Sequence, residues 1–206
     1  MNDGDLGLRE RKKRETRLAL SLATIRLSVE HGWDNVTVDD IAAAANVSVR
    51  TFRNYFSSKA EAVASRHLER MQQVAEELLA RPESEALWEA IPAAVLARFA
   101  LGQDMTAAGP QDEHWMAGIR LMLSAPAVQA AIVEANVAAQ QELTAAVAVR
   151  TGTDPERELY PKLVAASVIA ACAVVVEHIQ RSDSPGLLLP LLVEALTRLA
   201  AGLPEP

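Results

Sequence analysis

The sequence predicts an all-α protein of about nine helices. Alanine and leucine dominate a chain of 206 residues that is 50% hydrophobic but only 4% aromatic, a composition that favours helices. Apolar residues recur at intervals of three and four through most of the chain, between residue types that commonly cap helices. No alternating run indicates a strand, and the length suits one large or two modest domains.

One stretch near the N-terminus contains two short helices joined by a tight turn. Thr37 and Asp40 form a capping box that starts a first helix over residues 38–45. Asn46 then falls where a left-handed residue commonly ends a helix, and Ser48 caps the second helix. This pattern predicts a helix-turn-helix within a three-helix N-terminal domain, which is followed by a larger C-terminal helical domain.

The second of these helices separates apolar side chains from hydrogen-bond donors. Phe52 and Phe56 share one face, where they can join apolar residues of the first helix in a small core. Arg50, Arg53 and Asn54 share the open face, and these side-chain types contact base edges and phosphates. A helix of about eight residues, roughly 12 Å long, also fits a DNA major groove. The alternative is an ordinary helical corner whose arginines are solvated.

Charge is distributed unevenly along the chain. The net charge is −7, but residues 1–60 contain ten Lys or Arg against eight Asp or Glu, and the remainder contains ten against nineteen. Residues 9–17 alone carry six basic side chains, the type that neutralises phosphates and supplies most sequence-independent affinity for DNA. Such a run can also be a solvated surface. Beside a helix-turn-helix it predicts one end that docks on DNA, with an acidic remainder that DNA repels.

The other helices follow from apolar spacing, caps and breakers. We expect a disordered tail over residues 1–8, a helix-turn-helix DNA-binding domain over residues 9–58 and a ligand-binding and dimerisation domain over residues 59–206. Expected helices outside the motif span residues 9–31, 59–80, 84–101, 113–123, 126–149, 154–181 and 186–201, with a loop over residues 102–112. Asp154 followed by Pro155 is expected to start the helix that ends near Arg181.

The region between residues 32 and 59 resembles the DNA-binding module of the tetracycline-repressor (TetR) family. The matching positions are Gly32 followed by an aromatic residue, Thr37-Val38, Ile41-Ala42, Val47-Ser48, Thr51-Phe52, Tyr55-Phe56 and Lys59. With the basic first helix, the resemblance covers roughly a quarter to a third of the chain. It implies a sequence-specific DNA-binding transcriptional regulator, namely an all-helical homodimeric repressor whose larger domain binds a ligand and dimerises.

Candidate DNA contacts come from the charged run, the open helix face and the resemblance. By resemblance, the start of the second motif helix approaches the bases, whereas its end and the neighbouring helix starts touch phosphates. The expected contacts are Arg11, Lys12 and Lys13 in the charged run and Thr37, Ser48, Val49, Arg50, Thr51, Arg53, Asn54, Tyr55 and Lys59 in the motif. Asn46, Arg53 and Ala60 depart from residues common in the family, so the operator sequence cannot be inherited from relatives.

Two apolar stretches near the C-terminus are candidates for a homodimer interface. Residues 163–176 are apolar on all sides, so a helix there must be covered by its own subunit and by a partner. The leucine-rich residues 187–199 are the natural companion, and a two-fold axis would double the pair into a four-helix interface. Plain core packing is the alternative. A dimer would hold two recognition helices about 34 Å apart on a palindromic operator in double-stranded DNA.

Methionine and aromatic residues in the middle of the chain are candidates for a ligand pocket. Such a set suits a small apolar or amphipathic effector, for example a fatty acyl compound, although a stripe of this kind is more often plain core. The candidate lining residues are Trp88, Phe99, Met105, Trp115, Met116, Ile119, Arg120, Met122 and His178. The effector would act by fitting one hinge state better than the other.

The sequence offers no catalytic, metal or cofactor site. The four histidines are scattered, Cys172 is the single cysteine, and no phosphate loop or nucleophile motif is present. We therefore expect no enzyme, no metal and no cofactor. The longest apolar run is too short to cross a bilayer comfortably, which predicts a cytoplasmic protein without a membrane partner. The alternatives are a ligand-independent repressor and a helical protein-interaction module with a basic arm.

Overall fold

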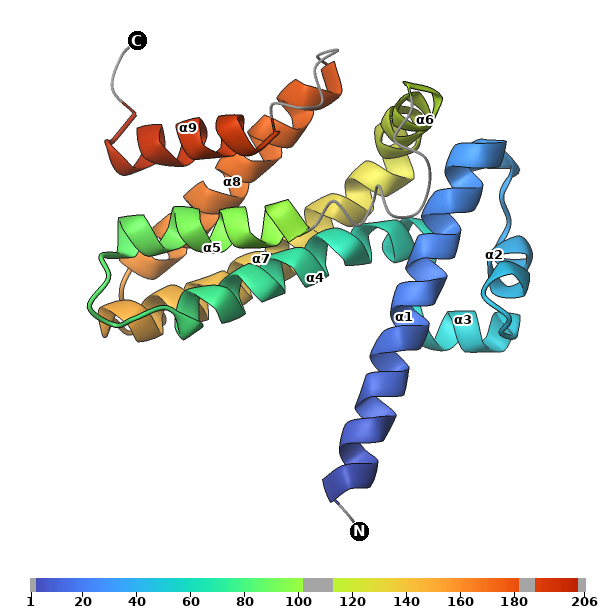
Figure 1. Ribbon diagram of the computed structural model, residues 1–206, viewed down its shortest axis with the longest axis horizontal. Helices are drawn as coiled ribbons and strands as arrows, with labels where there is room; N and C mark the ends of the chain where they lie inside the picture. Colours follow the sequence, from blue (N-terminus) through green and yellow to red (C-terminus); the bar gives the residue numbers. More distant parts are fainter. Residues whose placement is uncertain (1–2, 102–112, 182–187, 204–206) are drawn as a thin grey trace. The chain divides into compact units, whose positions relative to one another are not determined.

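The computed structural model describes residues 3–101, 113–181 and 188–203, and all regular secondary structure within them is helical (Figure 1). These residues form nine α-helices and one short 3-10 turn, with no strand, which confirms the all-α prediction. The elements are α1 Asp3–His31, η1 Trp33–Asn35, α2 Val38–Ala44, α3 Val49–Tyr55, α4 Lys59–Ala80, α5 Leu87–Leu101, α6 Glu113–Ser124, α7 Pro126–Thr151, α8 Tyr160–Arg181 and α9 Leu188–Ala200. The expected loop over residues 102–112 and the expected start of the last helix at residue 186 lie outside the described residues.

Two compact units make up the chain. The first unit comprises residues 1–67 together with residues 104–133, and the second comprises residues 68–103 together with residues 134–206. We expected a functional boundary near Lys59; the first unit reaches further along α4 and also takes in α6. The chain therefore enters the first unit twice.

One hydrophobic cluster of the first unit holds the helix-turn-helix together. Leu20 of α1, Ile41 of α2, and Phe52 and Phe56 around α3 are fully or almost fully buried in it. The two phenylalanine rings lie 5.7 Å apart between centroids, at an interplanar angle of 55°. This tilted aromatic pair lies within α3 and its C-cap, and the burial of both rings beside Leu20 and Ile41 packs α3 against α1 and α2.

A second cluster of the first unit packs α6 against the other side of α1. Ile25 and Val29 of α1 meet Trp115 and Ile119 of α6 in this cluster. The helices approach so closely that a Cβ atom added to Gly118 would lie 2.6 Å from Cγ1 of Val29 and 3.2 Å from its carbonyl oxygen. Only a residue without a side chain fits at this contact.

The second unit has a single large core. Side chains of α4, α5, α7, α8 and α9 meet in it, and its fully buried members include Met71, Leu78, Leu143, Val168 and Leu192. Cys172 also lies in this core, and burial raises the pKa of its thiol to about 12. A thiol with such a pKa stays protonated at neutral pH and is chemically inert.

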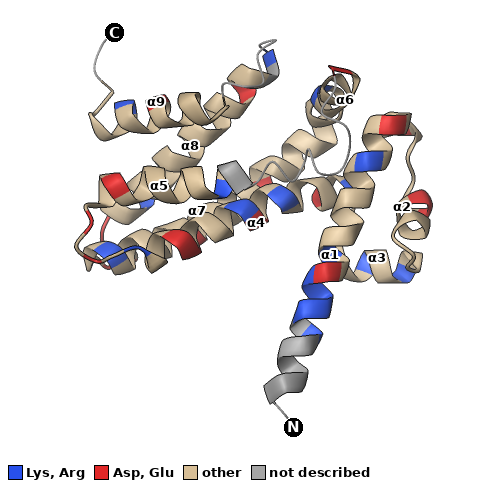
Figure 2. Cartoon of the chain, in the orientation of Figure 1, with Lys and Arg blue, Asp and Glu red and all other residues tan. Residues whose placement is uncertain are grey.

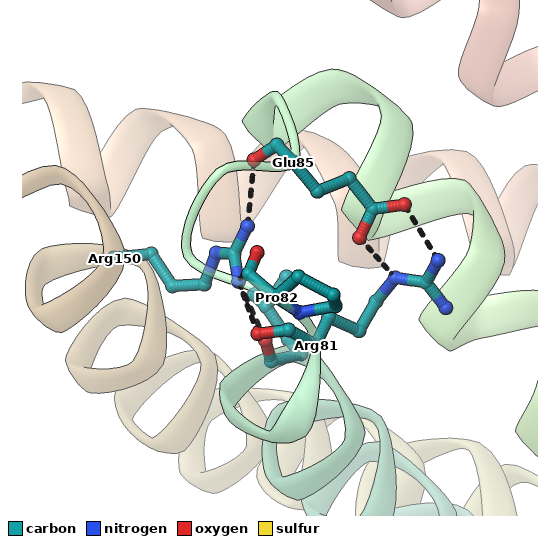
Figure 3. A network of polar contacts seen from close by, with 5 residues as sticks. Arg81, Pro82, Glu85 and Arg150 are labelled. Atoms are coloured by element: carbon teal, nitrogen blue, oxygen red, sulfur yellow. Dashed lines mark hydrogen bonds and ion pairs between the residues drawn. The ribbon is translucent and has the colours of Figure 1, made fainter.

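Arg150 near the end of α7 ties the α4–α5 connection to α7 (Figure 3). Its guanidinium donates hydrogen bonds to the backbone oxygens of Arg81 at 2.9 Å, Pro82 at 3.0 Å and Glu85 at 2.8 Å. Arg81 and Glu85 also form a bidentate ion pair, which raises the pKa of the arginine and lowers that of the glutamate. Three backbone oxygens of the connection that follows α4 are thereby satisfied.

Two helix starts differ from our predictions. Helix α1 begins at Asp3, so residues 3–8, which we expected to be disordered, are helical. Extending an established helix adds one hydrogen bond per residue without a new nucleation cost, and this outweighs two glycines. Helix α8 begins at Tyr160 instead of Asp154. Asp154 starts only a single turn, because Pro161 has no N–H with which to continue a helix from there.

Helix α8 is apolar enough to resemble a membrane span by length and composition. Of the described residues, Tyr160–Ile179 is the single helical stretch that meets this test, and the bent pair α6–α7 meets it only if taken as one span. A third of the α8 stretch is buried within the chain. Core helices of globular proteins share this composition, so α8 alone does not indicate a membrane protein.

Candidate nucleic-acid interface

Thr37 and Asp40 fix the start of α2. The backbone N–H of Thr37 donates to the Asp40 carboxylate at 2.8 Å, and the backbone N–H of Asp40 donates to the Thr37 hydroxyl at 3.2 Å. The Thr37 hydroxyl itself donates to the same carboxylate at 2.6 Å. These bonds from Thr37 lower the pKa of Asp40, so the carboxylate is ionised at neutral pH. The predicted capping box is thus present.

The turn between α2 and α3 has the expected left-handed residue. Asn46 has a φ of 54°, and the following residue, Val47, donates its N–H to the carbonyl of Ala42 at 2.9 Å. Ser48 then caps α3, because its hydroxyl accepts a hydrogen bond from the N–H of Thr51 at 3.0 Å. The two hydroxyls of Ser48 and Thr51 also pair at 2.8 Å. The caps predicted from the sequence therefore set the angle at which α3 leaves the turn.

Helix α3 buries its aromatic face and exposes its polar one, as predicted. Phe52 is fully buried, whereas Arg50, Arg53 and Asn54 are exposed. Of the other expected contacts in the motif, Val49, Thr51 and Tyr55 are half-buried and Thr37 and Ser48 are exposed. Three side chains rich in hydrogen-bond donors are thus free to meet DNA along one short helix.

Lys59 has a structural role that the sequence did not reveal. Its ammonium donates hydrogen bonds to the backbone oxygens of Trp33 and Val36, the latter at 2.9 Å. The same nitrogen lies 4.3 Å from the centroid of the Trp33 ring, a cation–π distance. Burial lowers the pKa of Lys59, and nearby Asp34 opposes that shift. Lys59 therefore anchors the start of α4 to the turn that precedes α2.

The basic residues of α1 are in the described part of the chain and exposed. Arg11, Lys12 and Lys13 all lie at the surface of its N-terminal half, where Lys and Arg gather in Figure 2. Arg11 pairs with Glu15 at 3.8 Å, and Arg17 lies 4.8 Å above the Phe56 ring. The charged run and the residues of α1 that pack in the helix-turn-helix core thus belong to one continuous helix.

Comparisons with known proteins agree with this geometry. The model for the bacterial regulatory proteins of the tetR family matches residues 22–64, and a model described as the MftR C-terminal domain matches residues 85–204. TcmR of Streptomyces glaucescens, an HTH-type transcriptional regulator, is 30% identical over 173 residues, which cover 82% of this chain and 75% of TcmR. The chain belongs to the tetR family of bacterial regulatory proteins.

Two further relatives cover different shares of this tetR-family regulator. An uncharacterised HTH-type transcriptional regulator of Mycobacterium bovis is 45% identical over 62 residues, or 30% of each chain. MftR of Mycobacterium tuberculosis, assigned provisionally as a mycofactocin biosynthesis transcriptional regulator, is 28% identical over 181 residues, or 86% of each chain. This tetR-family protein is therefore a DNA-binding transcriptional regulator and not an enzyme.

The candidate ligand residues of this tetR-family regulator fall into two different cores. Trp115, Ile119 and Met122 are buried in the cluster that joins α6 to α1, with Met116 half-buried beside them. Phe99 is buried in the core of the second unit, against which Trp88 packs. Arg120 is half-buried, His178 is exposed, and Met105 lies outside the described residues.

An open hollow of about 510 Å³ in the second unit of this tetR-family regulator contains none of the candidate ligand residues. It is lined by Val137, Gln140, Gln141, Thr144, Ala145, Pro155, Glu156 and Lys162. No cluster of three His, Cys, Asp or Glu side chains that could hold a metal occurs in the described ranges. The hollow joins the middle of α7 to the start of α8, a region that the sequence did not single out.

Proposed function

We propose that this regulator is a cytoplasmic homodimeric repressor that binds a palindromic operator and is released by a small apolar or amphipathic effector. The observation that carries the DNA part is the division of α3, in which Phe52 is buried while Arg50, Arg53 and Asn54 are exposed. A short helix that is held rigidly and bears arginines on its open face suits bidentate contacts with guanine in the major groove.

The exposed face of α8 supports the dimer. Leu163 is 60% and Val174 is 63% exposed, and Ala170 and Ala173 lie exposed between them. These residues recur at helical intervals, so they form one apolar stripe that water would cover in a monomer. The opposite face of the same helix is buried through Val164, Ala165, Val168 and Cys172. A second copy is the natural cover, because a two-fold axis brings the same stripe against itself.

Helix α9 contributes less to this proposed interface than its leucines led us to expect. Leu192 and Leu196 are fully buried in the core of their own unit. The exposed side of the helix includes Val193, which is 42% exposed, but also Glu194 and Arg198, which form an ion pair at 3.0 Å. We therefore place α8 at the centre of the interface and α9 at its rim.

The effector part of the proposal rests on composition more than on a cavity. Phe99 and Trp88 belong to the core of the second unit, and Arg70 lies 5.0 Å from the Phe99 ring. Aromatic, methionine and arginine side chains near one another suit an amphipathic ligand with an anionic head. Fatty acyl compounds are the probes we would use.

Selection of bound sequences from random double-stranded DNA tests the operator. We expect an inverted repeat with half-sites about one helical turn or a multiple of it apart. Arg50→Ala should weaken binding to the selected site by about 1–3 kcal/mol, or roughly 5- to 150-fold, and relax the preference at one position. Arg157→Ala, which removes an exposed arginine of the second unit, is the control and should bind as the wild type does.

Three outcomes would contradict parts of the proposal separately. Enrichment of no sequence would refute specific DNA binding at this site, and a motif without two-fold symmetry would refute the dimer. Release of DNA by fatty acyl compounds would support the effector, with a 1–3 kcal/mol change in DNA affinity as the expected coupling. No release by any of a broad set of apolar ligands would indicate a ligand-independent repressor.

A further inference from the structure

The N-terminal half of α1 extends beyond the body of the first unit. Helix α1 has 29 residues, and its first buried described side chain is Leu20. The described side chains between residues 9 and 15 are all exposed. At 1.5 Å per residue, the part from Asp3 to Arg17 is roughly 21 Å long. Figure 1 shows this part of α1 running past α3, with the chain terminus at its far end.

Two stripes on α1 give this extension a defined orientation. Leu20 and Leu27 face the cluster that contains Phe52 and Phe56, whereas Ile25 and Val29 face the cluster that contains α6. Side chains separated by seven, eleven or eighteen residues lie almost above one another on a helix, because these intervals are close to whole turns. The two stripes can therefore be followed from the buried part of α1 into the exposed part.

The stripe on the helix-turn-helix side is basic. Counting back from Leu20 by seven and eleven residues gives Lys13 and Arg9, and both are exposed. Arg17 lies one turn after Lys13 on the same stripe. Its guanidinium is 4.8 Å from the ring of Phe56, the residue that follows α3, so the stripe meets the packed part of the first unit at this point. The cations of this stripe therefore share the side of α1 on which α3 packs.

The opposite stripe has a different character. Counting back eleven residues from Ile25 gives Arg14, and eighteen residues from Val29 gives Arg11. Arg11 lies 3.8 Å from Glu15, and both side chains are about two-thirds exposed. This stripe thus faces the α6 side of α1, and part of its charge is already balanced.

We infer that the first four turns of α1 form a second DNA-contacting element, in which Arg9 and Lys13 bind phosphates that flank the base pairs read by α3. The inference rests on the proposed function of α3. Double-stranded DNA is the partner favoured, because the stripe is continuous with the side of α1 that carries the recognition helix, and its two cations lie about 6 Å apart along the helix. Arg11 and Arg14 lie on the other side and contribute little, so Arg11, a contact expected from the charged run alone, is not among the residues that bind these phosphates.

Two double variants of equal charge test the inference. Arg9→Ala/Lys13→Ala removes two cations from the proposed contact stripe, and Arg11→Ala/Arg14→Ala removes two from the opposite stripe of the same helix. Alanine preserves helicity, so circular dichroism of each variant should match the wild type. Each protein is titrated with a selected operator as a minimal duplex and as one extended by about ten base pairs on each side, over a range of salt concentrations.

The wild type should bind the extended duplex more tightly than the minimal one. Arg9→Ala/Lys13→Ala should abolish that gain, weaken binding about tenfold, and lower the slope of log Kd against log salt by about 1.8 per chain, since each phosphate contact contributes about 0.9. Arg11→Ala/Arg14→Ala should keep the gain. Equal losses in both variants would show that the arm acts only through its net charge and would overturn the inference.

Failure of the arm and failure of the proposed function remain distinguishable. If the wild type binds a selected operator but gains nothing from the flanks, the arm is refuted while α3 stands as the reader. If no sequence is selected, the proposed function fails. The two double variants then still report on the arm with a random duplex, where equal affinity of both would refute it.

Discussion

At the scale of the residue, Asp40 makes the start of α2 sensitive to acid. Its pKa is lowered mainly by the hydrogen bonds from Thr37, so the folded value lies below the ordinary value of 3.8. A carboxylate whose pKa falls on folding stabilises the folded state above its unfolded pKa, and this stabilisation is lost as the pH falls through the folded pKa. The capping box therefore supports the helix-turn-helix at neutral pH and stops doing so in acid.

Asp40→Asn should accordingly lower stability at neutral pH, and the difference from the wild type should shrink as the pH falls below 3.8. Urea unfolding followed by circular dichroism between neutral and acid pH measures this. Asp39→Asn controls for the loss of one carboxylate from the same helical turn. If the difference in free energy of unfolding between Asp40→Asn and the wild type does not change with pH, the ionised form of Asp40 is not the source of the stabilisation.

Lys59 should matter for stability as well as for DNA. Lys59→Met keeps an apolar stem near Trp33 but removes both hydrogen bonds to backbone oxygens, which should lower the free energy of unfolding by about 1–3 kcal/mol. If Lys59 also touches a phosphate, as the resemblance implies, the salt slope of DNA binding falls by about 0.9 per chain in the same variant. Unchanged unfolding would refute the anchoring role.

The motif residues were predictable from the sequence to the extent that their partners are close in the chain. Thr37, Ser48 and Asn46 act on residues three to five positions away, so spacing alone places them. Lys59 bonds to oxygens more than twenty residues earlier, which no local pattern can show. Its expected phosphate contact stays a prediction.

At the scale of the element, the contact between α1 and α6 depends on Gly118. Gly118→Ala would normally favour a helix by about 1 kcal/mol, but here the new methyl group would meet Val29 at 2.6 Å. We expect a net loss of about 1–3 kcal/mol from this overpacking. Thermal unfolding of Gly118→Ala, Val29→Ala and the double variant forms a cycle, in which Gly118→Ala should cost less when Val29 is already truncated. Purely additive effects would contradict the packing account.

Arg150 should be the strongest polar contributor to the α4–α5 connection. Arg150→Ala leaves three backbone oxygens without their partner and should lower the free energy of unfolding by about 2–3 kcal/mol. Arg150→Lys should restore less than half of the lost free energy of unfolding, because a single ammonium group cannot reach all the backbone oxygens that the two guanidinium nitrogens bind. Arg157→Ala, at an exposed ion pair, should change stability by less than about 0.5 kcal/mol. Equal effects at both positions would refute the clamp.

The element boundaries show where pattern reading fails. Helix α4 has the expected bounds, because Ser58 caps its start and Pro82 follows its end. The start of α8 was wrong by six residues, since Asp154 and Pro155 resemble a helix start but Pro161 prevents the helix from running through. The packing of α6 on α1 was missed entirely, because apolar periodicity identifies a buried face without naming its partner.

At the scale of the whole molecule, the exposed stripe on α8 leads to a prediction about assembly. Leu163→Glu/Val174→Glu places two charges in the proposed interface and should convert a dimer into a monomer, as measured by sedimentation, with weaker binding to a two-site operator. Ser84→Glu, at an exposed position of the connection between α4 and α5 and outside the proposed interface, is the control and should stay dimeric. A wild type that sediments as a monomer would refute the dimer directly.

The all-helical class was predictable along the chain, because composition and caps are distributed along it. The family was predictable only from the motif between residues 32 and 59, although the family models match residues 22–64 and 85–204. By contrast, the sequence could not predict whether the candidate ligand residues lie together in one pocket. Trp115 and Phe99 are both buried and apolar, yet they belong to different cores, and only the folded chain separates them.

The return of α6 and the start of α7 to the first unit has a consequence for how the protein is made. Ile25, Val29 and Val63 are covered by Trp115, Ile119 and Met122, which leave the ribosome dozens of residues later. During synthesis the N-terminal helices therefore spend a period with one side uncovered, and that side is apolar. For the same reason, a gene fragment that ends after α4 would encode the recognition helix α3 but not α6, which covers the apolar side of α1. The unit that contains the recognition helix is therefore one compact structure that is encoded by two separate segments of the gene.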